Sequence, residues 1–277
     1  MEKRYRSESP DDFFSVAEHF KFDPDEVCRV LRGELQCLVF RGFCPAADCE
    51  VLFNRFLTHP LTRVRSGDAV GRYLGTFHWQ KEVEEYLGEC RSMAPAVEQL
   101  VSSSGDDHGW RVFEDSLKER LAASSVILRR AIWRGQEVAS PLIRAWDGRS
   151  DFSLVPHEDM AQCMDPGQLD FEIQSVPNFS VCSANLCIEN AGGGQLVLWD
   201  RIPTAAERRR LGTEFTGGPY PLNFVEGRRR IDLDVRKGDL YVFNGATVHA
   251  VAATSGQRAT ISCLLGFNDE ANVVMWT

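Results

Sequence analysis

A histidine and an aspartate two positions apart, His157 and Asp159, lie at the end of the apolar segment Phe152–Asp159. In an extended strand, residues i and i+2 point to the same face, so both side chains would aim at one point and Glu158 would point away. An imidazole from His249 would complete the two-histidine, one-carboxylate set that holds Fe(II). Ligand type alone leaves zinc open, because hydrolytic zinc sites use the same groups. A His-x-Asp pair also fits a surface turn with solvated side chains. Other parts of the sequence are therefore needed to choose between a metal site and a surface turn.

Arg258 follows His249 by about the length of one strand. The planar guanidinium of arginine can pair bidentately with a carboxylate, and Thr260, on the same strand face, adds a hydroxyl. A dicarboxylic keto acid that chelates a metal would need such groups at its far end. The alternative is an arginine on a solvated strand face. Arg144 is a second candidate, for binding either the co-substrate or a substrate carboxylate.

The composition favours a folded, acidic protein. The chain has 277 residues, of which 43% are hydrophobic and 10% aromatic, enough for a sizeable core. Its net charge is −9 and its pI is about 5.3, which argues against a nucleic-acid-binding or anionic-membrane-binding protein. The start of the sequence lacks the apolar segment of a signal peptide, and no run approaches 18 apolar residues. We therefore expect a cytoplasmic protein.

Nine cysteines are scattered along the chain without any Cys-x-x-Cys pair. This pattern favours small buried thiols in a reducing compartment and gives no support to a cysteine-based zinc site.

Helical periodicity and capping signals dominate the first half of the sequence. A short apolar run from Leu38 to Phe43 predicts a strand there. We expect helices in five segments: 10–20, one starting at Asp23, 45–59, 79–103 and 110–124.

The second half reads as short strands separated by glycine-rich turns, which is typical of a jelly roll. The expected strands are 143–146, 152–159, 179–189, 195–200, 230–235, 240–243, 248–253 and 259–267. We expect one folded unit over 1–277, with a mainly helical part over 1–135 packed on a jelly-roll core over 136–277. The segment 204–229, rich in Gly, Pro and charge, would be an insertion covering the active site. The long separation of His157 and His249 suggests opposite ends of the barrel.

The order of these residues resembles the Fe(II)/2-oxoglutarate-dependent oxygenases: His157-x-Asp159, His249, then Arg258-x-Thr260. The strand 193–199 is similar to the Gly-Gly-x-Leu strand of that family. Over about 130–277, the segments 139–144, 238–244 and 274–277 also resemble a small-molecule subgroup, which includes indole-alkaloid halogenases and N-acyl amino acid hydroxylases. In the halogenases a glycine replaces the metal-binding carboxylate. This chain keeps Asp159, so the resemblance implies hydroxylation, or a related oxidation such as desaturation.

The resemblance implies an α+β fold with a double-stranded β-helix. It implies Fe(II) held by the three ligands, O2 as oxidant, and 2-oxoglutarate converted to succinate and CO2, with Arg258 and Thr260 on its far carboxylate. The substrate would be a small molecule, an amino acid derivative or natural-product intermediate, with no nucleic-acid or membrane partner; a homodimer is compatible. The residues suggested for substrate binding are Arg72, Thr76, Phe77, Trp79 and Leu154. The alternative for the segment 72–79 is an ordinary loop that leads into the helix at Trp79, and the alternative for Leu154 is core packing.

Two other classes stay open at this stage. One is a cupin-type metal-dependent isomerase or hydrolase that uses the same ligands, and the other is a non-catalytic jelly-roll binding module. Dependence on 2-oxoglutarate would separate the first from an oxygenase, and failure to bind iron would favour the second.

Overall fold

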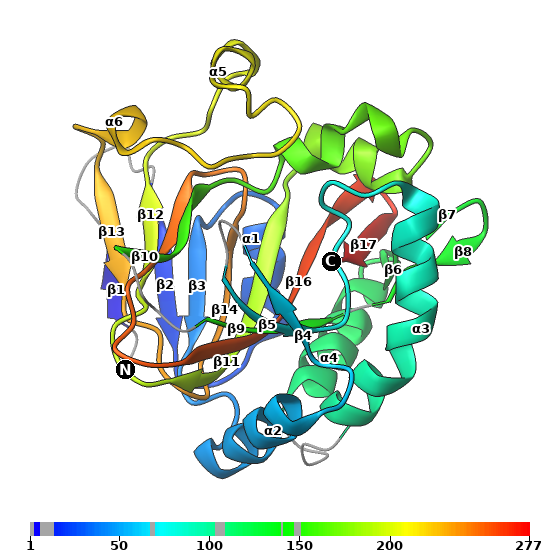
Figure 1. The fold of residues 1–277 in the computed structure, drawn as a ribbon, viewed down its shortest axis with the longest axis vertical. Helices are drawn as coiled ribbons and strands as arrows, with labels where there is room; N and C mark the ends of the chain where they lie inside the picture. Colours follow the sequence, from blue (N-terminus) through cyan, green and yellow to red (C-terminus); the bar gives the residue numbers. More distant parts are fainter. Residues whose placement is uncertain (1–2, 6–13, 67–69, 103–108, 140, 147–150) are drawn as a thin grey trace.

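Two β-sheets enclose a cavity in the computed structural model of this chain (Figure 1). The structure describes residues 3–5, 14–66, 70–102, 109–139, 141–146 and 151–277. Within them, the larger sheet has eleven strands in the order β1-β2-β3-β14-β11-β16-β9-β5-β4, with β17 paired to β16 and β6 to β17. The smaller sheet has the order β10-β15-β12-β13.

The bounds of the larger sheet are β1 Lys3–Tyr5, β2 Val16–His19, β3 Cys37–Phe40, β4 Arg63–Arg65, β5 Gly71–Leu74, β6 Ile127–Arg130, β9 Leu142–Trp146, β11 Cys182–Asn190, β14 Leu240–Asn244, β16 Arg258–Asp269 and β17 Asn272–Trp276. The smaller sheet consists of β10 Phe152–His157, β12 Leu196–Trp199, β13 Arg230–Leu233 and β15 His249–Ala252. A separate hairpin is formed by β7 Ile132–Trp133 and β8 Gln136–Glu137. The helices are α1 Pro24–Leu31, α2 Ala46–Thr58, α3 Val83–Val101, α4 Trp110–Ala122, α5 Ala205–Leu211 and α6 Leu222–Val225, with 3-10 turns at Ala161–Met164, Pro166–Gln168 and Glu172–Asn178.

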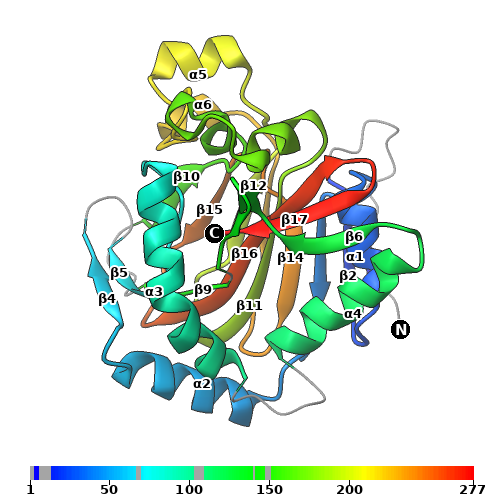
Figure 2. The ribbon, with the colours of Figure 1, turned by 90° about the vertical axis from the view of Figure 1, so that its right-hand side faces the viewer.

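Strand β16 shows why the larger sheet has one apolar and one polar face. Successive residues of a strand point to opposite faces. Ala259 and Ile261 join the hydrophobic core formed with helices α1 to α4, which lie around the larger sheet in Figure 2. Arg258, Thr260 and Ser262 alternate with them and therefore face the smaller sheet. The polar face of the sheet is thus turned inward, toward the cavity.

Helix α1 begins where the sequence predicts. The Asp23 carboxylate accepts a hydrogen bond from the Asp25 N–H at 2.9 Å, and Pro24 occupies the first turn, where a missing N–H costs nothing. The other predicted helices of the first half, apart from the segment 10–20, and the eight strands predicted in the second half are all present, with ends shifted by a few residues.

The N-terminal region differs from the prediction. Within the predicted helix 10–20, residues 10–13 lie outside the described residues, and Val16–His19 form strand β2, which pairs in parallel with β3. Val16 and Ala17 are buried in this pairing, so tertiary contacts decide the conformation. The strands of the first 135 residues extend both edges of the larger sheet, so this part also completes the sheet.

The nine cysteines are all buried and free of disulfides, as expected from their scatter. None of the helices in the described part of the chain combines the length and apolar character needed to cross a lipid bilayer.

Candidate active site

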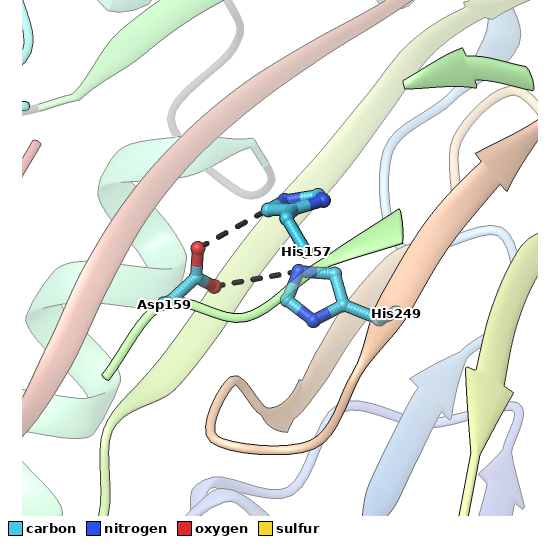
Figure 3. Close-up of side chains that lie close together, drawn as sticks. All are labelled: His157, Asp159 and His249. Atoms are coloured by element: carbon cyan, nitrogen blue, oxygen red, sulfur yellow. Dashed lines mark ion pairs between the residues drawn. The ribbon is translucent and has the colours of Figure 1, made fainter. Parts of the chain in front are cut away.

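Three side chains converge between the sheets: His157, Asp159 and His249 (Figure 3). His157 ends β10 and His249 begins β15, and the antiparallel pairing sets them directly opposite each other. Asp159, two residues past His157, turns back so that its carboxylate lies 4.0 Å from Nε2 of His157 and 3.5 Å from Nε2 of His249. All three ligand atoms lie within 4.8 Å of one another. The expectation that the two histidines lie at opposite ends of the barrel is therefore wrong, because adjacent strands carry them.

Backbone carbonyls determine which nitrogen of each imidazole faces the centre. Nδ1 of His157 lies 2.7 Å from the carbonyl oxygen of Val155, and Nδ1 of His249 lies 2.8 Å from that of Thr247. A carbonyl oxygen only accepts hydrogen bonds, so Nδ1 carries the proton in both rings. Both Nε2 atoms are left with a lone pair toward the carboxylate, the tautomer that a metal ligand needs.

The protonation states suit a cation. Burial lowers the pKa of His157 to about 3, with the neighbouring His249 acting in the same direction, and burial lowers the pKa of His249 to about 4. Burial raises the pKa of Asp159, an effect opposed by His157 and Arg144. Two neutral imidazoles and one carboxylate therefore present three acceptors to one point, a set that fits Fe(II).

Two residues that the sequence did not single out hold the Asp159 carboxylate. The Gln162 side-chain amide donates to Oδ1 of Asp159 at 3.1 Å. A Cβ atom at Gly245 would lie 2.7 Å from Oδ2 of Asp159, so only glycine allows this approach. The Asn244-Gly245 turn is visible in the sequence, but its contact with Asp159 is a tertiary one.

A buried guanidinium, that of Arg258, lies behind the cavity lining and contacts it through Tyr241. Arg258 is 0% exposed; its Nη2 donates to the Tyr241 hydroxyl at 2.8 Å, and its Nε and Nη1 form no hydrogen bond with the described residues. The hydroxyl of Thr260 is likewise buried without a partner there. The neighbouring Cys187 thiol supplies no anion, because burial raises its pKa to about 12. Buried donors of this kind need an acceptor, and a carboxylate of a bound dianion fits them.

Arg144 lies beside Thr260 in the register of β9 and β16 and lines the cavity near the three converging side chains. Its Nε is also buried without a hydrogen-bond partner among the described residues. The cavity has a volume of about 150 Å³ and is lined by both sheets, by residues before α3 and by the 204–229 segment. That volume lies below the roughly 300–1,000 Å³ of pockets for drug-sized ligands, so only a small molecule would fit.

Three of the five residues suggested for substrate binding line this cavity: Phe77, Trp79 and Leu154. The other two do not. Arg72 is exposed on β5, where the register pairs it with Ala145, on the face turned away from the cavity. Thr76 is buried and donates to the Glu89 carboxylate, which Lys81 also contacts.

His78 lines the cavity as a neutral histidine. Both side-chain N–H groups of Gln168 donate to the carbonyls of His78 and Lys81, so the Gln168 oxygen accepts from Nδ1 of His78 at 2.9 Å. Burial lowers the pKa of His78 from 6.5 to about 4. A lowered folded-state pKa means that the unfolded chain takes up a proton first, so stability is present above pH 6.5 and is lost as the pH falls toward 4.

We therefore expect the metal-free protein to lose about 2 kcal/mol more unfolding free energy between pH 7 and pH 5 than the His78→Gln variant does. Urea denaturation of both proteins at the two pH values measures this difference. Parallel pH profiles would show that His78 is not held neutral.

Comparison with known proteins adds one sequence relative and several structures of similar fold. No protein-family model matches the sequence. L-isoleucine 3(1)-dioxygenase from Pantoea ananatis is 28% identical over 247 residues, which cover 86% of this chain and 82% of that protein. An N-substituted L-amino acid dioxygenase from Burkholderia ambifaria AMMD superposes with a TM-score of 0.59 at 17% identity, covering 92% and 91% of the two chains. HygX from Streptomyces hygroscopicus, solved with nickel and 2-oxoglutarate bound, gives a TM-score of 0.50 at 14% identity, covering 88% and 86%. At these identities the two structures show a shared fold.

Proposed function

We propose that this chain, a member of the Fe(II)/2-oxoglutarate-dependent oxygenase superfamily, hydroxylates an unactivated C–H bond of a small amino acid or amino acid derivative. The enzyme uses Fe(II), 2-oxoglutarate and O2, and releases succinate and CO2. The observation that carries the assignment is the pairing of the three converging ligands with a buried guanidinium that has two donors without a hydrogen-bond partner among the described residues. The sequence relationship to an amino acid dioxygenase supports the substrate class.

The chain's own residues divide the work. His157, Asp159 and His249 would hold Fe(II), and Arg258, Thr260 and Arg144 would bind the carboxylates of 2-oxoglutarate. Bound iron with 2-oxoglutarate and O2 supplies the oxidising power, and the protein contributes placement.

Substrate selection falls to the outer walls of the cavity. Phe77, Trp79 and Leu154 give it an apolar surface, and the indole N–H of Trp79 donates to the carbonyl of Thr216 at 3.0 Å. This bond joins the wall before α3 to the 204–229 segment. The retained carboxylate of Asp159 supports hydroxylation over halogenation.

The two sheets are consistent with a double-stranded β-helix core in one domain over 1–277, and we include both in the proposal. The enclosed cavity of about 150 Å³ supports a free small molecule as substrate. The net charge of −9 supports the absence of a nucleic-acid or anionic-membrane partner. A homodimer remains part of the proposal. A cupin-type isomerase or hydrolase would have no use for a buried arginine arranged to receive the far carboxylate of a keto acid.

Anaerobic titration of the Fe(II)-loaded protein with 2-oxoglutarate tests the assignment. We expect a weak visible metal-to-ligand charge-transfer band that saturates in the wild type and is absent in His249→Ala. His59→Ala is the matched control, because His59 follows α2 outside the cavity lining. Iron binding without a band would favour the isomerase or hydrolase, and no iron binding would favour a binding module.

A further inference from the structure

Glu158 lies between two metal-ligand candidates in sequence, yet its side chain points away from them into the protein. It is 0% exposed. Its Oε2 accepts hydrogen bonds from the backbone N–H groups of Met160 at 2.6 Å and Ala161 at 3.0 Å. These bonds close the turn that leads through Asp159, so the conformation of the Glu158 carboxylate and the direction of Asp159 are coupled.

The other oxygen of this carboxylate is bound by the 204–229 segment, here named the cover segment. Nε of Arg208, on α5, donates to Oε1 of Glu158 at 2.8 Å, and the Tyr220 hydroxyl lies 3.4 Å from the same oxygen. Arg208 is only 4% exposed. A buried ion pair is costly to desolvate, and removal of one partner leaves the other charge buried and unpaired.

Backbone hydrogen bonds attach the cover segment on both sides of His157. The Glu158 N–H donates to the carbonyl of Gly217 at 2.7 Å, and the Tyr220 N–H donates to the carbonyl of Pro156 at 2.8 Å. In Figure 1 the cover segment, with α5 and α6, lies at the top of the molecule, above the ends of the sheets.

Two glycines allow the cover segment to approach this closely. Gly217 has φ +69°, and a Cβ atom there would lie 2.0 Å from the Glu158 carbonyl oxygen. A Cβ atom at Gly218 would lie 2.8 Å from Cβ of His157. The cover segment and the 156–159 segment therefore pack closely against each other, and the Glu158–Arg208 ion pair is part of this contact.

We propose that Glu158 and Arg208 are positioning residues that hold the 157–159 turn in the shape required for metal binding. The Glu158 carboxylate is bound by the turn itself and by Arg208. Glu158 anchors the turn to the cover segment, and the turn aims His157 and Asp159 at His249. This inference rests on the proposed metal-binding function. It assigns a role to Glu158, the residue between the two ligands, and to the buried Arg208 on α5.

Equilibrium titration with Co(II), read from its visible absorption, tests the proposal without any turnover. We expect Glu158→Gln and Arg208→Met each to raise the Kd for Co(II) by about 10- to 100-fold, the range for residues that orient metal ligands. Because both act through one contact, the double variant should lose no more than the weaker-binding single variant. Arg208→Lys, which keeps the charge, should recover part of the loss.

Glu207→Gln is the matched control: it makes the same carboxylate-to-amide change as Glu158→Gln, and Glu207 lies next to Arg208 on α5. Glu207 pairs with Arg201 and takes part in the capping box of α5, which glutamine can maintain. It should leave the Kd for Co(II) unchanged. Thermal unfolding of the metal-free proteins separates the roles, because a purely structural pair would lower Tm without changing the Kd of the folded protein.

Wild-type Kd in both single variants, or losses that add in the double variant, would overturn the positioning role. If a single variant does not fold, the double variant decides alone: it contains no unpaired buried charge, and wild-type Co(II) affinity in it would also overturn the role. Failure of the wild type to bind Co(II) would instead overturn the proposed metal site.

Discussion

Asp159→Ala is expected to abolish tight Fe(II) binding and to lower succinate formation from 2-oxoglutarate by more than about 100-fold. Residues that merely orient metal ligands contribute 10- to 100-fold to metal affinity or activity, so the loss of a ligand should exceed that range. Among the described residues, the converging set contains a single carboxylate, and the two imidazoles are neutral at pH 7. Alanine therefore removes the negative charge that balances the metal at this point.

The thermal stability of Asp159→Ala should show that the variant loses metal binding without losing its fold. In the metal-free protein Asp159 is a buried carboxylate facing two nitrogen lone pairs, so its removal should leave Tm unchanged or raise it. The rise in Tm that Fe(II) or Co(II) produces in the wild type should disappear. Asp232→Ala is a suitable control, because Asp232 forms an exposed ion pair with Arg230 on β13. Wild-type iron affinity in Asp159→Ala would remove this residue from the metal site.

The local part of the site could be predicted from the sequence because its geometry depends on strand periodicity. Arg258 and Thr260 share a face of β16, as strand periodicity predicts. The His157-x-Asp159 pair was also recognisable, although Asp159 lies in a bend beyond the end of β10 and reaches His157 through that turn. The strands that carry them were also recognisable, since apolar runs and glycine-rich turns are local signals.

The features of the fold and site that the sequence did not predict depend on contacts between distant segments, which no local sequence pattern encodes. Arg72 illustrates this: its neighbour Tyr73 pairs with Arg144, but Arg72 itself pairs with Ala145 and so faces the other side. A shift of one residue decides between cavity and surface. Strand β2 and the Glu158–Arg208 contact have the same origin, because each needs a partner that lies far away in the chain.

Arg258→Met is expected to raise the concentration of 2-oxoglutarate needed for half-saturation by about 10- to 150-fold. A hydrogen bond to a charged group contributes roughly 1.5–3 kcal/mol, and each 1.4 kcal/mol corresponds to a factor of ten. The charge-transfer band should still appear at high 2-oxoglutarate, because the metal ligands are unchanged. Arg258→Lys should lie between the two proteins, since an ammonium keeps the charge but loses the planar pair of donors.

The metal-free Arg258→Met protein should be at least as stable as the wild type. Arg258 is 0% exposed and carries two donors without a partner among the described residues, so a methionine of similar length removes an unmet desolvation cost. The wild type should gain stability from 2-oxoglutarate in the presence of Co(II), and the variant should not. Arg129 lies on β6 and pairs with Glu172. Arg129→Ala breaks this ion pair and should show the reverse: lower stability and an unchanged response to 2-oxoglutarate. An unaltered half-saturation in Arg258→Met would show that the far carboxylate binds elsewhere, and Arg144 would then be the next residue to replace.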